Sequence, residues 1–194
     1  MKPNGKRPRR LPEILTEDEQ ARLLAGLSSN DPASTRGRAI LRTFLDCGLR
    51  ASELINLQVK NVDFMAGRMK VRGKGDRDRV LWFSGCTQAA LEAWLEVKPP
   101  SSSPLVFTSL DGKRPVNGRV MRRWIKALGV KAGIENLHPH TCRHSFATDM
   151  LKAGVNLPTI QKMLGHSNIG TTMIYLSIHD SDVELAMKGF RREG

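Results

Sequence analysis

Between residues 62 and 83 the chain changes its hydrophobic period, and this change limits the folds open to it. Met69 and Val71 stand at alternate positions, and a second apolar run covers residues 80–83. A turn sequence, Gly73-Lys74-Gly75-Asp76, separates the two runs. The pattern predicts two strands with Lys74 at the hairpin tip. Because helical spacing prevails elsewhere, we expect an α+β fold that is mainly helical, with a small antiparallel sheet.

Helix-end signals bound the remaining segments. Thr16 and Glu19 form a capping-box pattern, Gly48 suits a left-handed helix end, and Pro139 suits a first helical turn. Helices are expected from Thr16 to near Gly26 and over residues 33–47, 51–57, 86–97, 117–132, 138–154 and 158–164, with shorter ones beginning near 170 and 180. The stretch 99–104, rich in Pro and Ser, is interpreted as a crossover inside one domain.

Charge and composition indicate a polyanionic partner. The chain has 194 residues, of which 40% are hydrophobic, enough to bury a core in one domain. Its formal net charge of +12 favours nucleic acid as a partner. No apolar run approaches the length of about 18 residues that spans a bilayer, and three cysteines at long spacings suit a reducing compartment. We therefore expect a cytoplasmic protein with no membrane partner.

Two basic segments are candidates for contact with phosphates. Residues 1–10 offer little apolar surface to bury, so they are expected to form a tail or linker. The helix over 117–132 has cations along one side, whereas Val120, Trp124, Leu128 and Val130 point elsewhere. Each basic segment is either a solvated surface or a surface that follows the DNA backbone. The cations are Lys2, Lys6, Arg7, Arg9 and Arg10 in the tail and Arg119, Arg122, Arg123 and Lys126 in the helix.

A tyrosine and two histidines suggest phosphoryl transfer. His166 precedes Tyr175, the only tyrosine in the chain, by nine residues. A phenol has a pKa of about 10, so it needs a base and a fixed orientation to attack a phosphodiester. His140 and Arg143 stand three residues apart on a predicted helix, which puts their Cβ atoms about 5–6 Å apart.

Two arginines are candidates for neutralising the phosphate. Guanidinium groups on the non-bridging oxygens offset the charge that repels the nucleophile and that grows in the transition state. Arg143 is one candidate. Arg50 is the other, at the junction of two predicted helices, with Glu53 three residues on and able to orient it.

A zinc site is the alternative interpretation of the same region. His138, His140, Cys142 and His144 are four possible ligands within seven residues. Alternate residues on a helix do not converge on one point, and no second ligand pair follows. The sequence therefore favours phosphoryl transfer over zinc.

Several motifs together resemble one family. They are Gly48-Leu-Arg50-Ala-Ser-Glu-Leu, Gly73-Lys74-Gly75, His140-Thr-Cys-Arg143-His-Ser-Phe-Ala-Thr, Leu164-Gly-His166-Ser and Tyr175. In this order they resemble the catalytic domain of tyrosine recombinases, the phage integrase and Xer-type family, over about residues 11–178. The resemblance implies a site-specific recombinase that cleaves and rejoins double-stranded DNA through a covalent 3′-phosphotyrosyl intermediate.

The resemblance also implies a role for each site residue. Tyr175 is the nucleophile, Arg50 and Arg143 clamp the phosphate, His140 is the general base, Lys74 is the general acid, and His166 hydrogen-bonds the phosphate. No cofactor and no metal ion are implied, because the phosphotyrosine stores the bond energy and arginines neutralise the charge.

Assembly follows from the resemblance as well. Recombination requires four strand cleavages, which implies a tetramer on two DNA duplexes. The protomers are expected to be monomers in solution. Residues 179–194 form a separate segment whose apolar stripe, Val183, Ala186, Met187 and Phe190, either folds back or docks on a neighbouring protomer. We expect the helical core-binding domain usual in the family to be missing from this chain, as either a fragment or a naturally minimal recombinase.

Two other functions share these residues. A type IB topoisomerase-like enzyme would use the same chemistry to relax DNA as a monomer. An integrase-derived regulator would bind DNA without catalysis. The Leu164-Gly-His166-Ser motif favours the recombinase over the first, and the six occupied catalytic positions disfavour the second.

Overall fold

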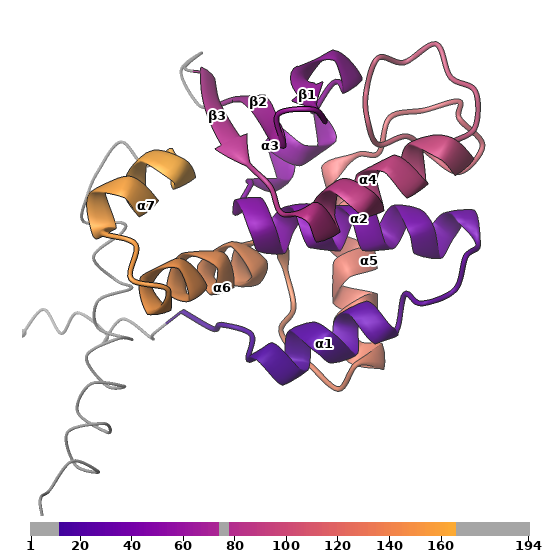
Figure 1. The fold of residues 1–194 in the computed structure, drawn as a ribbon. Coiled ribbons are helices and arrows are strands. Elements are labelled where there is room, and N and C mark those ends of the chain that lie inside the picture. The colour runs from indigo at the N-terminus through magenta and orange to yellow at the C-terminus, as the bar shows by residue number, and fades with distance from the viewer. Residues whose placement is uncertain (1–11, 74–77, 166–194) are drawn as a thin grey trace, which may run out of the picture.

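The computed structural model describes residues 12–73 and 78–165 (Figure 1). The predictions for the basic tail, the hairpin tip with Lys74, His166, Tyr175 and the C-terminal helix lie outside these residues. In the described part, no helix is long and apolar enough to cross a membrane.

The described fold is mainly helical with one small antiparallel sheet, as the change of period predicts. The elements in chain order are α1 (Glu17–Ala25), α2 (Pro32–Cys47), α3 (Ala51–Ile55), the 3-10 turn η1 (Val59–Asn61), β1 (Val62–Asp63), β2 (Arg68–Arg72), β3 (Asp78–Trp82), α4 (Gly85–Val97), α5 (Gly118–Lys131), α6 (Pro139–Lys152) and α7 (Leu157–Leu164).

Local signals place the helix ends. Thr16 and Glu19 form the complete capping box before α1, and Asn117 accepts hydrogen bonds from the first turn of α5. Gly48 ends α2 in the left-handed conformation with a φ of 58°. Helix α3 ends at Ile55, two residues before the predicted end, because the next backbone segment turns away to pair with the loop near Leu105.

The sheet has the order β1-β2-β3, with each neighbouring pair antiparallel. Met69 pairs with Leu81, and Val71 pairs with Arg79. Side chains alternate across a strand, so Met69, Val71 and Leu81 are buried while Trp82 remains 61% exposed. The predicted hairpin is confirmed, and β1 adds a third short strand at its edge.

The core is built around α2, which packs against both α4 and α6. Trp94 of α4 is fully buried, and its indole nitrogen donates to the Val106 carbonyl at 2.8 Å. The chain after the Pro- and Ser-rich stretch returns to this core, where the Val106 amide donates to the Leu57 carbonyl at 2.8 Å. Helix α7 lies at the edge of the molecule, next to α6 and β3 (Figure 1).

Of the apolar residues of α5 that the sequence places away from the cations, only Leu128 is buried. Met121, Ile125 and Leu128 are its buried apolar residues, whereas Val120 and Val130 are 51% and 64% exposed. The four DNA-binding candidates on this helix, Arg119, Arg122, Arg123 and Lys126, are all exposed, as the sequence predicts.

Candidate active site

Three consecutive carbonyl groups at the end of α7 each accept a hydrogen bond from a different arginine. Arg79 Nε donates to Met163 (2.7 Å), Arg143 Nη2 to Leu164 (2.6 Å) and Arg50 Nη2 to Gly165 (3.0 Å). The last carbonyls of a helix have no partner within the helix and carry the negative end of its dipole. Guanidinium groups satisfy both demands, so the end of α7 gathers three cations at one place.

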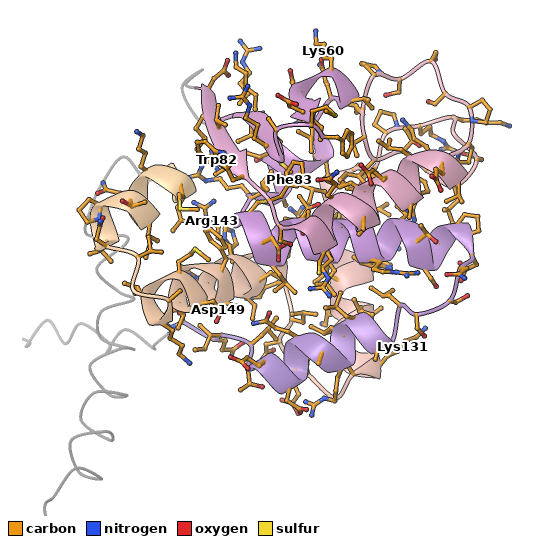
Figure 2. The ribbon with its side chains drawn as sticks, viewed as in Figure 1. Lys60, Trp82, Phe83, Lys131, Arg143 and Asp149 are labelled. Atoms are coloured by element: carbon orange, nitrogen blue, oxygen red, sulfur yellow. The ribbon has the colours of Figure 1, made fainter. Side chains whose placement is uncertain are left out.

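Arg143 is the most buried of the three, with 3% relative exposure. Its Nη1 donates to the Gly48 carbonyl at 2.6 Å, while its Nη2 donates to Leu164. Figure 2 labels it where α6, α7 and the end of α2 converge. A buried charge requires such charge-assisted hydrogen bonds, and here they join the ends of two helices to the central helix α6.

Arg50 is held at the start of α3 by Glu53. Its Nη1 contacts Glu53 Oε1 at 2.9 Å, and its backbone amide donates to Glu53 Oε2 at 2.8 Å. The prediction that Glu53 orients Arg50 is confirmed. The Arg50 side chain is 28% exposed, so part of it remains open to solvent.

Arg79 is the residue that sequence reasoning missed. It donates to both Glu53 oxygens, Nη1 to Oε1 at 2.7 Å and Nη2 to Oε2 at 2.8 Å. The available signal was its position on β3, two residues before the buried Leu81 and therefore on the inward side of the strand. An arginine that faces inward needs a buried acceptor, and Glu53 is that acceptor.

Glu53 carries the one carboxylate among these four side chains. Burial by itself would raise the pKa of Glu53, but hydrogen bonds from Arg79 and from Arg50 outweigh burial and lower it. Glu53 is therefore ionised at neutral pH. With three guanidinium groups against one carboxylate, the cluster carries a net charge of +2.

His140 lies within the electrostatic reach of this cluster. Desolvation lowers its pKa, and the charges of His138, Arg143 and Arg50 lower it further. At neutral pH the imidazole is therefore uncharged and able to accept a proton. The ring of His144, 6.4 Å away between centroids, has its pKa lowered to about 4 mainly by burial.

The structure thus brings together two of the six predicted catalytic residues, Arg50 and Arg143, and a third, His140, lies three residues before Arg143 on α6. Lys74, His166 and Tyr175 lie outside the described residues, although His166 directly follows Gly165 in the chain. Among the DNA-binding candidates, the basic side of α5 belongs to a helix that packs against α3.

The geometry does not support the alternative interpretation of this region as a zinc site. Cys142 is fully buried, and burial raises the pKa of its thiol to about 12, which disfavours the thiolate that zinc requires. Within residues 12–73 and 78–165, no three His, Cys, Asp or Glu side chains are grouped so as to hold a metal ion.

A polar groove of about 970 Å³ begins beside Arg50 and continues between α3, η1 and the β2–β3 hairpin. Its cations besides Arg50 are Lys60, Lys70 and Arg72, and Lys60 is labelled at the outer edge of the molecule in Figure 2. Lys70 pairs with Asp78 at 2.7 Å on the neighbouring strand.

Comparison with known proteins agrees with this fold. Residues 13–182 match the phage integrase family, and the chain belongs to this family. Tyrosine recombinase XerC of Pseudomonas fluorescens is 41% identical over 175 residues, which are 89% of this chain and 58% of that protein. The chain therefore spans little more than half the length of this relative.

Solved structures give the same family fold. XerA recombinase superposes with a TM-score of 0.82 at 34% identity, over 96% of this chain and 68% of that one. The Tn1549 transposon integrase, solved in complex with circular intermediate DNA, superposes with a TM-score of 0.72 at 22% identity, over 84% of this chain and 61% of that one. None of these matches favours a topoisomerase or a non-catalytic regulator.

Proposed function

We propose that this chain is the catalytic part of a site-specific recombinase that cleaves and rejoins double-stranded DNA through a covalent 3′-phosphotyrosyl intermediate. The observation that carries the proposal is the arginine cluster at the end of α7, where Arg50 and Arg143 are held on the consecutive carbonyls of Gly165 and Leu164. Membership of the phage integrase family supports it.

Arg50 and Arg143 stabilise the charge on the reacting phosphate. Each guanidinium group has five N–H donors, and Arg50 uses two of them on described residues. Its remaining donors and the partial exposure of its side chain suit a non-bridging phosphate oxygen. Because the carbonyls of α7 and Glu53 fix the positions of these groups in advance, they need little reorganisation when charge builds up in the transition state.

The remaining roles follow the family pattern. Tyr175 forms a bond to phosphorus as the bond from phosphorus to the 5′ oxygen breaks. His140 accepts the phenolic proton, and Lys74 donates a proton to the departing 5′ oxygen. His166 hydrogen-bonds the phosphate. Reversal of these steps by a 5′ hydroxyl rejoins the strand, so the phosphotyrosine conserves the bond energy and no cofactor is consumed.

The DNA partner is supported by the charge distribution. The net charge of +12 attracts a polyanion, and the groove beside Arg50 continues the positive surface along the hairpin. The exposed basic side of α5 and the basic residues 1–10 are further candidates for phosphate contacts. Exchange between two duplexes requires four active protomers, so we propose a tetramer in synapsis, with residues 179–194 as the segment that joins protomers.

The proposal is tested by covalent trapping. The chain is incubated with nicked duplexes, from which the short cleaved fragment dissociates, so that the strand cannot be rejoined. The sequence around the nick is randomised to cover many possible target sites. We expect an SDS-resistant protein–DNA adduct from the unaltered chain and none from Tyr175→Phe, which loses only a hydroxyl group. An adduct from Tyr175→Phe would show that the nucleophile is another residue. No adduct from the unaltered chain would contradict strand transfer itself.

The same assay separates the general acid from the clamp. Lys74→Ala should cleave slowly, and a sulfur at the 5′-bridging position should largely restore its rate, because a thiolate leaves without a proton. Arg143→Ala should gain little from that sulfur. Equal rescue of both variants would remove the distinction between the two roles.

A further inference from the structure

Arg79 has no role in the proposed chemistry, yet it is the one of the three arginines whose guanidinium group donates to both oxygens of Glu53. Its side chain is 11% exposed, and it donates to both carboxylate oxygens and to the Met163 carbonyl. These three bonds use both edges of the planar guanidinium group. Strand β3, helix α3 and the end of α7 are therefore joined through a single side chain.

Each oxygen of Glu53 is shared between Arg79 and Arg50. Oε1 accepts from Nη1 of Arg79 (2.7 Å) and Nη1 of Arg50 (2.9 Å). Oε2 accepts from Nη2 of Arg79 (2.8 Å) and the backbone amide of Arg50 (2.8 Å). The two-point contact with Arg79 fixes the plane of the carboxylate, and that plane sets the direction from which Arg50 must approach.

Arg79 also holds the second partner of Arg50. It donates to Met163, two residues before Gly165, whose carbonyl accepts from Arg50. A Cβ atom added to Gly165 would lie 3.0 Å from Arg79 Nη1, so the chain at the end of α7 passes directly against this guanidinium group. Arg79 thus binds Glu53 directly and holds the helix end that carries the Gly165 carbonyl.

We propose that Arg79 is a positioning residue that sets the orientation of Arg50 by holding Glu53 and the end of α7 together. This inference rests on the proposed function, because it assigns Arg79 an effect on phosphate cleavage through Arg50. The competing interpretation is a buried ion pair that only stabilises the fold.

Single-turnover cleavage of the nicked duplex at saturating DNA separates the two. Arg79→Ala should slow adduct formation on the order of a hundredfold, because a displaced clamp loses the alignment that the transition state needs. DNA affinity should change little. In an Arg50→Ala background the same substitution should add little further loss, because the group that it positions is already gone.

Two further variants keep the test sharp. Arg79→Lys keeps a positive charge beside Glu53, so we expect this variant to fold even if Arg79→Ala does not. The single nitrogen of lysine cannot reproduce the two-point contact of the guanidinium group with both Glu53 oxygens. We expect at least about tenfold slower cleavage from a folded Arg79→Lys protein. Arg36→Ala is the matched control, because Arg36 is a partly buried arginine on α2 that donates to the Thr108 carbonyl at 2.9 Å. It should lower stability without slowing cleavage by the folded protein.

The outcomes distinguish the two proposals. Normal cleavage by folded Arg79→Lys or Arg79→Ala, or an equal further loss in the Arg50→Ala background, overturns the positioning role while strand transfer stands. Failure of the unaltered chain to form any adduct overturns strand transfer, and the positioning role with it.

Discussion

The Arg143 guanidinium group donates to the Gly48 carbonyl at 2.6 Å, joining residues that are 95 positions apart in the chain. Gly48 is the left-handed end of α2, and Arg50 follows it by two residues. The bond therefore ties one phosphate-clamp candidate to the turn that carries the other. Both depend on the shape of the backbone at Gly48.

Arg143 and Arg50 should differ in their contributions to stability. Arg143→Ala leaves two buried carbonyls without their donors, which should lower the free energy of unfolding by on the order of 3 kcal/mol. Arg50→Ala should cost about 1 kcal/mol, because Glu53 keeps its bonds to Arg79. Both variants should cleave roughly a hundredfold or more slowly. Urea unfolding and covalent trapping measure the two effects, and equal losses of stability would contradict the assignment.

Gly48→Ala should be unusually damaging. A Cβ atom at this position would overlap Phe146 Cδ1, and the φ of 58° is itself strained for alanine. Together these effects should lower the free energy of unfolding by about 2–5 kcal/mol. Gly133→Ala is the control, because its φ is 73° but nothing lies within 4 Å, so only about 1–2 kcal/mol should be lost. Thermal or urea unfolding of the two variants isolates the cost of the overlap with Phe146. Similar losses of stability in both would show that this overlap contributes little.

Stability should fall as the solution is acidified towards pH 4, before Glu53 is protonated. The pKa of His144 drops from 6.5 to about 4 in the folded state, so the unfolded chain takes up the proton first. This contribution is present above pH 6.5 and is lost as the pH falls from 6.5 towards 4. His140, whose pKa is also lowered, adds in the same direction. Unfolding midpoints across this range should fall less steeply for His144→Gln, and an unchanged slope would exclude His144 as the cause.

The three cysteines should differ in reactivity. Cys86 is exposed, whereas Cys47 and Cys142 are buried, and burial raises the pKa of both of the latter thiols. A thiol reagent should therefore modify one cysteine quickly in the native protein and all three after unfolding. Cys86→Ser should abolish the fast phase. A second fast thiol would mean that the packing around α2 or α6 is looser than described.

Binding to duplex DNA should weaken steeply as salt rises from roughly 50 to 200 mM, because cations that bind phosphates release counterions. Replacing Arg122 and Lys126 of α5 with alanine should reduce the slope of log affinity against log salt by about 0.9 for each phosphate that the replaced side chain neutralises. Arg22→Ala is the control, since that charge is already paired with Asp18 at 2.7 Å. Fluorescence anisotropy measures the slopes, and an unchanged slope in the α5 variant would place the DNA elsewhere.

The sequence by itself determined the local structure. The side chain of Thr16, the amide oxygen of Asn117 and the left-handed conformation open to Gly48 act within one or two turns, so helix ends follow from neighbouring residues. The alternation of Met69 and Val71 likewise fixed which side of β2 is buried. Arg50 and its partner Glu53 are three residues apart, which is why that pair was predictable.

Only the tertiary structure decided how the cluster is held. Arg50 meets Gly165 across 115 positions, and Arg79 meets Met163 across 84. No periodicity encodes such contacts, because they depend on how α7 packs against α6 and β3. Packing against neighbouring elements also explains α5, in which Met121 and Ile125 are buried while Val120 and Val130 are exposed. A pattern identifies an apolar or charged side chain, but the neighbouring elements determine what that side chain contacts.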